Sequence, residues 1–94
     1  MKLMCICGSG LGSSFLLEMN VKDTLKALGV EDVEVEHSDL DSCTSDMADV
    51  FVVAVDIADE VHRLGEVVVI NNIIDKKELH EKLKELMIKH GKLT

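Results

Sequence analysis

Cys7 and the glycine-rich segment that follows it are the residues of this sequence best suited to do chemistry. An apolar run, MKLMCIC, leads into the segment and a helical pattern leaves it. A turn of this kind places backbone N–H donors and the positive end of a helix dipole around one thiol, which suits a phosphate and lowers the thiol pKa below about 8.5. The sequence therefore predicts Cys7 as a nucleophilic thiolate. The predicted phosphate-binding residues are Gly8, Ser9, Gly10, Leu11, Gly12, Ser13 and Ser14.

The composition of the segment narrows its chemistry. Gly8, Gly10 and Gly12 allow positive φ angles and close approach to a ligand, and Ser13 and Ser14 can cap the helix. A dinucleotide fingerprint would need a glycine where Ser13 stands, and a low-molecular-weight phosphatase loop would need an arginine there. No Gly-Lys-Ser/Thr follows, so a P-loop is also excluded. These absences favour a carrier that accepts a phosphoryl group and protects it from water.

Two alternatives stay open at this point. One is a non-catalytic module that binds an anion or a nucleotide, with Cys7 serving only as a buried packing residue beside a tight turn. The other is a thiol redox protein that uses Cys5 and Cys7, although two residues so close on one strand give poor disulfide geometry. A buried structural thiol is the simpler reading of Cys5, and Cys43 is expected to be incidental.

The other titratable residues show no pattern of a metal or cofactor site, and neither is expected. The histidines lack metal-ligand spacing and are interpreted as solvated surface residues: His37, His62, His80 and His90. Of these, only His37 is expected near the edge of the site. Asp56 is interpreted as a helix cap. A direct catalytic role of Asp56 is not expected, because its carboxylate would repel a phosphoryl group on Cys7.

The elements that must position Cys7 alternate between strands and helices. Apolar runs predict strands at 3–6, 33–37, 50–55 and 67–70. Helical periodicity and end signals predict helices at 13–28, at 56–64 with Asp56 as its N-cap and Gly65 at its end, and from a capping box at 75–78 to about 90. The polar segment 40–47 is predicted to be a loop with at most a short helix.

This order predicts an α/β fold with a four-stranded parallel sheet, order 2-1-3-4, and helices on both faces, in a Rossmann-like arrangement. Residues 1–94 are expected to form a single domain. Ligands bind beyond the carboxyl ends of such strands, where Cys7 is placed. The loops around Asp56 and Asn71–Asn72 are expected on the same rim.

The bulk composition limits the partners. The chain is 47% hydrophobic with two aromatic residues, has a net charge of −8 and contains a single arginine, Arg63. Nucleic-acid binding is therefore not expected. No apolar run is long enough for a membrane span, no signal peptide is recognised, and the three cysteines indicate reduced thiols in the cytoplasm.

The motif CGSGLGSS, residues 7–14, resembles the phosphocysteine loop of the IIB components of the phosphoenolpyruvate-dependent sugar phosphotransferase system. The closest likeness is to the ascorbate-type branch of the lactose/galactitol/ascorbate group. It extends over LLEMNVKDTLKALG, MADVFVVAVDIADEV and VVVINNIIDKKELHEKL, and so over nearly the whole chain. One departure is that Ala54 and Val55 stand where relatives often carry small hydroxyl residues after the third strand, which leaves a phosphate-binding role of that loop in doubt.

The resemblance implies a phosphotransferase with no cofactor. Cys7 would take a phosphoryl group from a phosphohistidine on a IIA protein and pass it to a carbohydrate, ascorbate-like or a related sugar, bound by a membrane-embedded IIC transporter. Carbohydrate choice belongs to IIC, so the kinship does not name the sugar.

Overall fold

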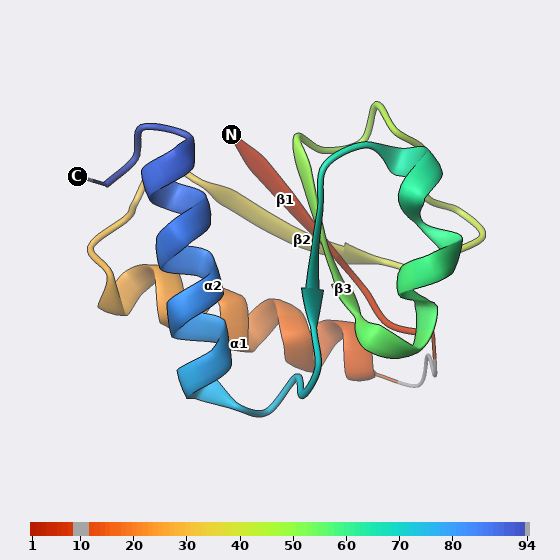
Figure 1. The fold of residues 1–94 in the computed structure, drawn as a ribbon, viewed down its shortest axis with the longest axis horizontal. Helices are drawn as coiled ribbons and strands as arrows, with labels where there is room; N and C mark the ends of the chain where they lie inside the picture. Colours follow the sequence, from red (N-terminus) through yellow and green to blue (C-terminus); the bar gives the residue numbers. More distant parts are fainter. Residues whose placement is uncertain (9–11, 94) are drawn as a thin grey trace.

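The protein is built on a sheet of four parallel strands, seen in a computed structural model that describes residues 1–8 and 12–93. The strands are β1 (Lys2–Ile6), β2 (Glu34–Ser38), β3 (Val50–Ala54) and β4 (Val67–Ile70). They lie in the order β2-β1-β3-β4, and every neighbouring pair is parallel (Figure 1). The predicted strand order is confirmed, and it brings the carboxyl ends of all four strands to one edge.

Two long helices cover one face of the sheet. They are α1 (Ser13–Ala27) and α2 (Lys76–Lys89), which also pack against each other. Their inward apolar residues have the predicted helical spacing and are buried: Leu17, Val21 and Leu25 from α1, and Leu79, Leu83, Leu86 and Met87 from α2. They meet Leu3, Cys5, Val50 and Val52 from the sheet, and so form the larger of two cores.

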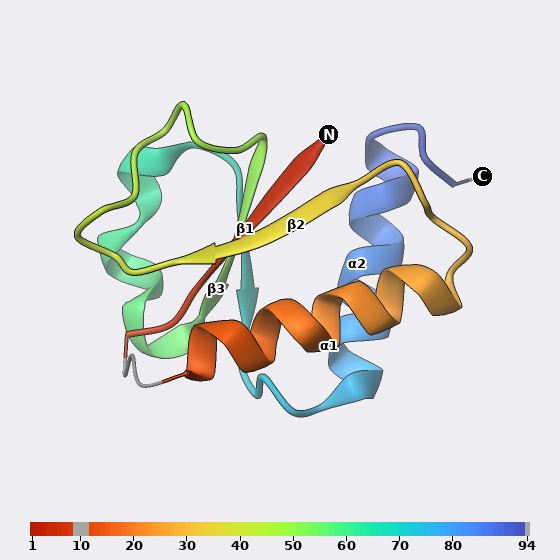
Figure 2. The ribbon, with the colours of Figure 1, turned by 180° about the vertical axis from the view of Figure 1, so that it is seen from behind.

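The opposite face is covered by two short 3₁₀ helices, η1 (Val55–Glu60) and η2 (His62–Leu64), together with the loop between β2 and β3. Figure 2 shows these short helices at the other end of the molecule from α2, with β2 running along the outer edge of the sheet. Their side chains Ile57, Val61 and Leu64 pack on Met4, Ile6, Phe51 and Val53. Alternate residues of β1 and β3 thus point to different cores, which explains why β3 is continuously apolar.

Residues 56–64 do not form the predicted α-helix with Asp56 as N-cap. Ala54 occupies the N-cap position of η1 without a side-chain cap hydrogen bond, and Val61, at φ −111°, separates η1 from η2. Two tight turns allow Ile57 to meet Gly8 and also to pack with Val61 and Leu64 in the second core.

The start of α2 follows the prediction only in part. The side chain of Asp75 accepts hydrogen bonds from the backbone N–H groups of Lys77 and Glu78, as a cap should. Glu78 does not reach back to Asp75 as a capping box requires. Its carboxylate instead accepts from the backbone N–H groups of Asn71 and Asn72, at 2.8 and 2.9 Å, and so fixes the loop that follows β4.

Candidate functional site

Cys7 lies immediately after β1, and five residues later Gly12 begins the approach to α1. Gly12 has φ +88° and is the residue at the N-cap position, so Ser13 and Ser14 are the first helical residues and not the cap that the sequence suggested. The backbone N–H groups of the first turn of a helix have no partner within the helix. The backbone N–H groups of Ser14 and Phe15 lie in this first turn, at the end of α1 that follows Cys7. The predicted site residues Ser9, Gly10 and Leu11 lie outside the described residues.

The Cys7 thiol is buried, with 5% of the residue exposed. Burial raises the pKa of this thiol, a hydrogen bond with the Ser13 side chain lowers it, and the negative charge of Asp56 raises it further. The net direction is upward, so the sequence-based expectation of a lowered thiol pKa is wrong for the unphosphorylated chain. Cys7 is consequently a protonated thiol at neutral pH.

Close packing around position 8 requires a glycine there. A Cβ atom at this position would overlap Cγ2 of Ile57 and lie 2.9 Å from Oδ2 of Asp56, both on η1. No other side chain fits there without a shift of that helix. The loop after β3 thus reaches the residue next to Cys7, which confirms that it lies on the same rim.

The loop after β3 contributes a carboxylate to this rim and no hydroxyl. Ala54 is half-buried at the end of β3, and Val55 is exposed as the first residue of η1. The loop around Asp56 was expected on this rim, but the approach of its carboxylate to Gly8 was not, because Asp56 was predicted to cap a helix. Its only sequence signal is its position two residues after the end of a buried strand.

The other two cysteines are structural. All three cysteines are free thiols, and Cys5, which is fully buried under α1, has its pKa raised by burial. Cys43 is 1% exposed within the second core, where the Arg63 guanidinium donates to its carbonyl oxygen at 3.2 Å. Cys43 was expected to be incidental in a polar loop, and it is in fact a core residue.

Two histidines are more than solvated surface residues. His37 Nδ1 lies 2.6 Å from Oε1 of Glu18, a buried α1 carboxylate that also accepts from Lys22 at 2.8 Å. Burial opposes ionisation of Glu18, but its bonds with Lys22 and His37 outweigh burial and lower its pKa. His90 Nε2 similarly lies 2.9 Å from Glu66. Glu18 therefore ties the edge strand β2 to α1, close to the sheet edge that carries Cys7.

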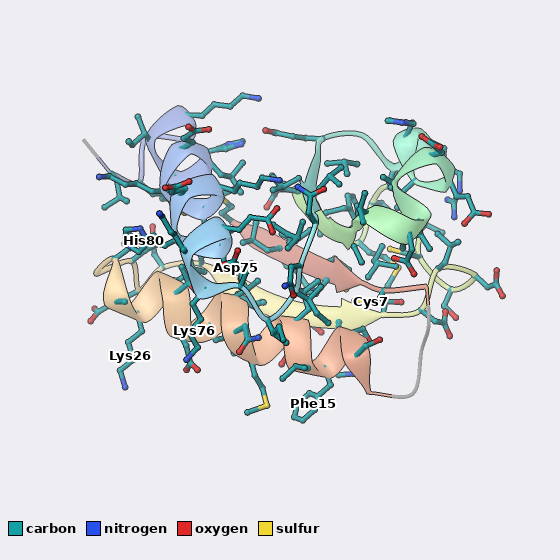
Figure 3. The ribbon with its side chains drawn as sticks, turned by 60° about the horizontal axis from the view of Figure 1, so that its bottom comes forward. Cys7, Phe15, Lys26, Asp75, Lys76 and His80 are labelled. Atoms are coloured by element: carbon teal, nitrogen blue, oxygen red, sulfur yellow. The ribbon has the colours of Figure 1, made fainter. Side chains whose placement is uncertain are left out.

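The loop after β4 is tied to the same helix. Asn20 on α1 donates from its side chain to the carbonyl oxygen of Ile73 at 2.9 Å. Figure 3 shows Cys7 and Phe15 toward one end of the molecule, while Lys26 and His80 lie toward the other. Within residues 1–8 and 12–93, no group of three or more histidine, cysteine or acidic side chains is arranged to hold a metal ion.

The sequence family described as PTS system, Lactose/Cellobiose specific IIB subunit matches residues 2–85. The chain belongs to this family. It is thus a IIB domain of the sugar phosphotransferase system, a class of phosphotransferase component. This supports the broader likeness found in the sequence, whereas the ascorbate-type branch stays a prediction.

Among solved structures, this IIB domain is similar to the lactose-specific IIB component domain of the phosphoenolpyruvate:carbohydrate phosphotransferase system from Streptococcus pneumoniae. The TM-score is 0.64 with 19% identity, over 94% of this chain and 95% of that chain. At this identity the likeness concerns the fold. No curated protein matches the chain. No helix in the described part of this IIB domain is both long and apolar enough to cross a bilayer.

Proposed function

We propose that this IIB domain is a phosphocarrier in which Cys7 holds the phosphoryl group. The observation that carries the proposal is the position of Cys7 in a chain of the IIB family, between the end of β1 and the first turn of α1. Transfer of a phosphoryl group asks mainly for positioning and charge stabilisation. Backbone N–H groups at the start of α1 can supply both, since hydrogen bonds to charged groups contribute about 1.5–3 kcal/mol each.

The donor in this proposal is a phosphohistidine on a IIA protein. The sulfur of Cys7 forms a bond to phosphorus as the nitrogen–phosphorus bond of the donor breaks. The proton of the thiol goes to the imidazole that leaves, so the step balances without another base. Because the thiol pKa is raised, the sulfur must lose its proton as its bond to phosphorus forms.

The acceptor is a hydroxyl group of a carbohydrate bound by a IIC transporter. An oxygen–phosphorus bond forms, the sulfur–phosphorus bond breaks, and the hydroxyl proton returns to the sulfur of Cys7. We place Cys7 as the catalytic residue and residues 8–14 as the phosphate-binding loop. Ascorbate-like and related sugars are the acceptors to test first, and we place the reaction on the cytoplasmic side of the membrane.

The Cys7→Ser variant tests the proposal. We expect it to take no phosphate on residue 7 from phosphorylated IIA, because the serine oxygen is a much weaker nucleophile than sulfur, while its circular dichroism spectrum is unchanged. Intact-protein and peptide mass spectrometry after incubation with phosphoenolpyruvate, the general phosphotransferase proteins and IIA measure the adduct. Cys5→Ala is the matched control and should still be phosphorylated on Cys7. Normal phosphorylation of Cys7→Ser would exclude the assignment.

A further inference from the structure

Asp56, on η1, places a negative charge on the rim beside Cys7. It does not cap the helix, yet its carboxylate oxygen lies 2.9 Å from the position of a Cβ at Gly8. Ile57, the next residue, is buried and contacts the same glycine more closely still. The backbone of η1 therefore packs against Gly8, and this packing places the exposed side chain of Asp56 beside that glycine.

Two elements supply the side chains that act on Cys7. Ser13 on α1 donates a hydrogen bond, and Asp56 on η1 contributes negative charge. Glu18, also on α1, acts on Cys5 and is itself paired with Lys22 and His37. Among these described groups, Asp56 supplies the charge that acts directly on Cys7, and its sign opposes an anion there.

Phosphocysteine carries close to two negative charges at neutral pH, whereas the thiol carries none. A carboxylate close to Cys7 therefore raises the free energy of the phosphorylated state relative to the thiol state. We propose that Asp56 is an electrostatic positioning residue that keeps the phosphoryl group on Cys7 easy to pass on, and so favours delivery over storage. The proposal rests on the phosphocarrier function above.

Asp56 remains an unchanged carboxylate throughout both transfers. The bonds and protons exchange as described above, between donor nitrogen, Cys7 sulfur and acceptor oxygen. Repulsion between Asp56 and the phosphoryl group is gained when the sulfur–phosphorus bond forms and relieved when it breaks. Asp56 thus affects the equilibrium distribution of the phosphoryl group between IIA and Cys7, and the rate at which Cys7 releases that group to the acceptor.

The first test uses the unphosphorylated chain, so it does not depend on any phosphotransfer. Asp56→Asn keeps the shape and removes the charge, and Asp59→Asn makes the same change at another exposed position of η1. We expect alkylation of Cys7 by iodoacetamide near neutral pH to become about three- to tenfold faster in Asp56→Asn, with its pH profile displaced to lower pH. Asp59→Asn should match the wild type, and Asp56→Glu should stay close to it. Peptide mass spectrometry separates Cys7 from Cys5 and Cys43.

The second test measures phosphoryl exchange with IIA at equilibrium. Asp56→Asn should shift the equilibrium toward phospho-Cys7 about three- to tenfold and slow delivery to IIC-bound carbohydrate. If the wild type is phosphorylated on Cys7 and Asp56→Asn behaves like Asp59→Asn in either test, the role of Asp56 is wrong and the phosphocarrier function stands. If the wild type takes no phosphate on Cys7, the phosphocarrier function fails, and the role in delivery fails with it, whatever the alkylation rates are.

Discussion

Gly8 and Gly12 bound the same loop, but different constraints require a glycine at each. Gly12 has φ +88°, a conformation that costs other residues energy. Gly8 is not among the glycines with positive φ, and it is constrained by contact with Ile57. The sequence predicted conformational freedom for both, because contact with a distant element cannot be seen in a local motif.

Gly8→Ala should lower the free energy of unfolding by about 1–3 kcal/mol, because the new methyl group overlaps the Ile57 side chain in the second core. Urea denaturation of the wild type and the variant measures the change. In an Ile57→Ala background the overlap is removed, so the same substitution should cost clearly less. Equal costs in both backgrounds would show that the contact with Ile57 is not the cause.

The placement of Cys7 could be predicted from sequence, whereas the direction of its thiol pKa could not. A cysteine between an apolar strand and a glycine-rich turn is a local signal, and the structure has Cys7 directly after β1. The burial of Cys7 depends on packing around the end of β1, and the charge of Asp56 comes from η1, which follows β3. Both effects depend on tertiary structure. A prediction based on the helix dipole alone therefore gives the wrong direction for the shift of the thiol pKa.

At the scale of elements, Glu78 is the residue that joins β4 to α2. Burial opposes its ionisation, but hydrogen bonds from Lys82 and from the backbone of Asn71 and Asn72 outweigh burial and lower its pKa to about 2. The carboxylate thus satisfies two N–H groups of the loop and an ion pair with Lys82 at 2.8 Å. The loop that follows β4 is therefore held by the first turn of α2.

Glu78→Gln should lower the free energy of unfolding by about 1–2 kcal/mol near neutral pH, because a neutral amide accepts these bonds less strongly. Since the folded pKa of Glu78 lies below its ordinary value of 4.5, its contribution is present above about pH 4.5 and is lost as the pH falls toward 2. Denaturation of both proteins at a series of pH values should therefore show a difference in the free energy of unfolding that becomes smaller in acid. Glu81→Gln, at an exposed position of α2, is the control and should change little. A difference that is constant with pH would contradict a stabilising role of the ionised Glu78 carboxylate.

Most of the elements could be predicted because their signals are local. Strand β4 begins and ends at the predicted residues, and α1 and α2 end within one residue of the prediction. The 3₁₀ helices η1 and η2 could not be anticipated, because the spacing of Ile57, Val61 and Leu64 fits a single α-helix equally well. Residues 55–64 form two short helices, and in this arrangement they contact both the second core and Gly8.

At the scale of the whole molecule, large apolar side chains are exposed near Cys7. Phe15, Leu16 and Met19 on the first turns of α1 are 50%, 40% and 46% exposed, and Val55 on η1 is 51% exposed. Phe15 also packs against His37, with ring centroids 5.6 Å apart. A buried thiol can exchange a phosphoryl group only with a partner seated against its surroundings. Under the proposed function, these residues are expected to contact IIA.

Phe15→Ala should raise the KM for phosphorylated IIA about fivefold with little change in kcat, corresponding to about 1 kcal/mol of lost contact. Initial rates of phosphoryl transfer at varied IIA concentration measure both constants. Ile88→Ala is the control: Ile88 is similarly exposed, at 45%, but lies near the end of α2. Equal effects of the two substitutions would argue against a IIA contact at the start of α1.

The contact between Gly8 and Ile57 also has an evolutionary consequence. Since Cγ2 of Ile57 fills the space of a Cβ at position 8, the two positions cannot change independently. A lineage that acquires alanine at position 8 should carry, or first acquire, a residue at position 57 that is not branched at Cβ, such as leucine or alanine. The segment after β3 is therefore expected to coevolve with the loop that holds the reactive cysteine, even where it contributes no ligand to the phosphate.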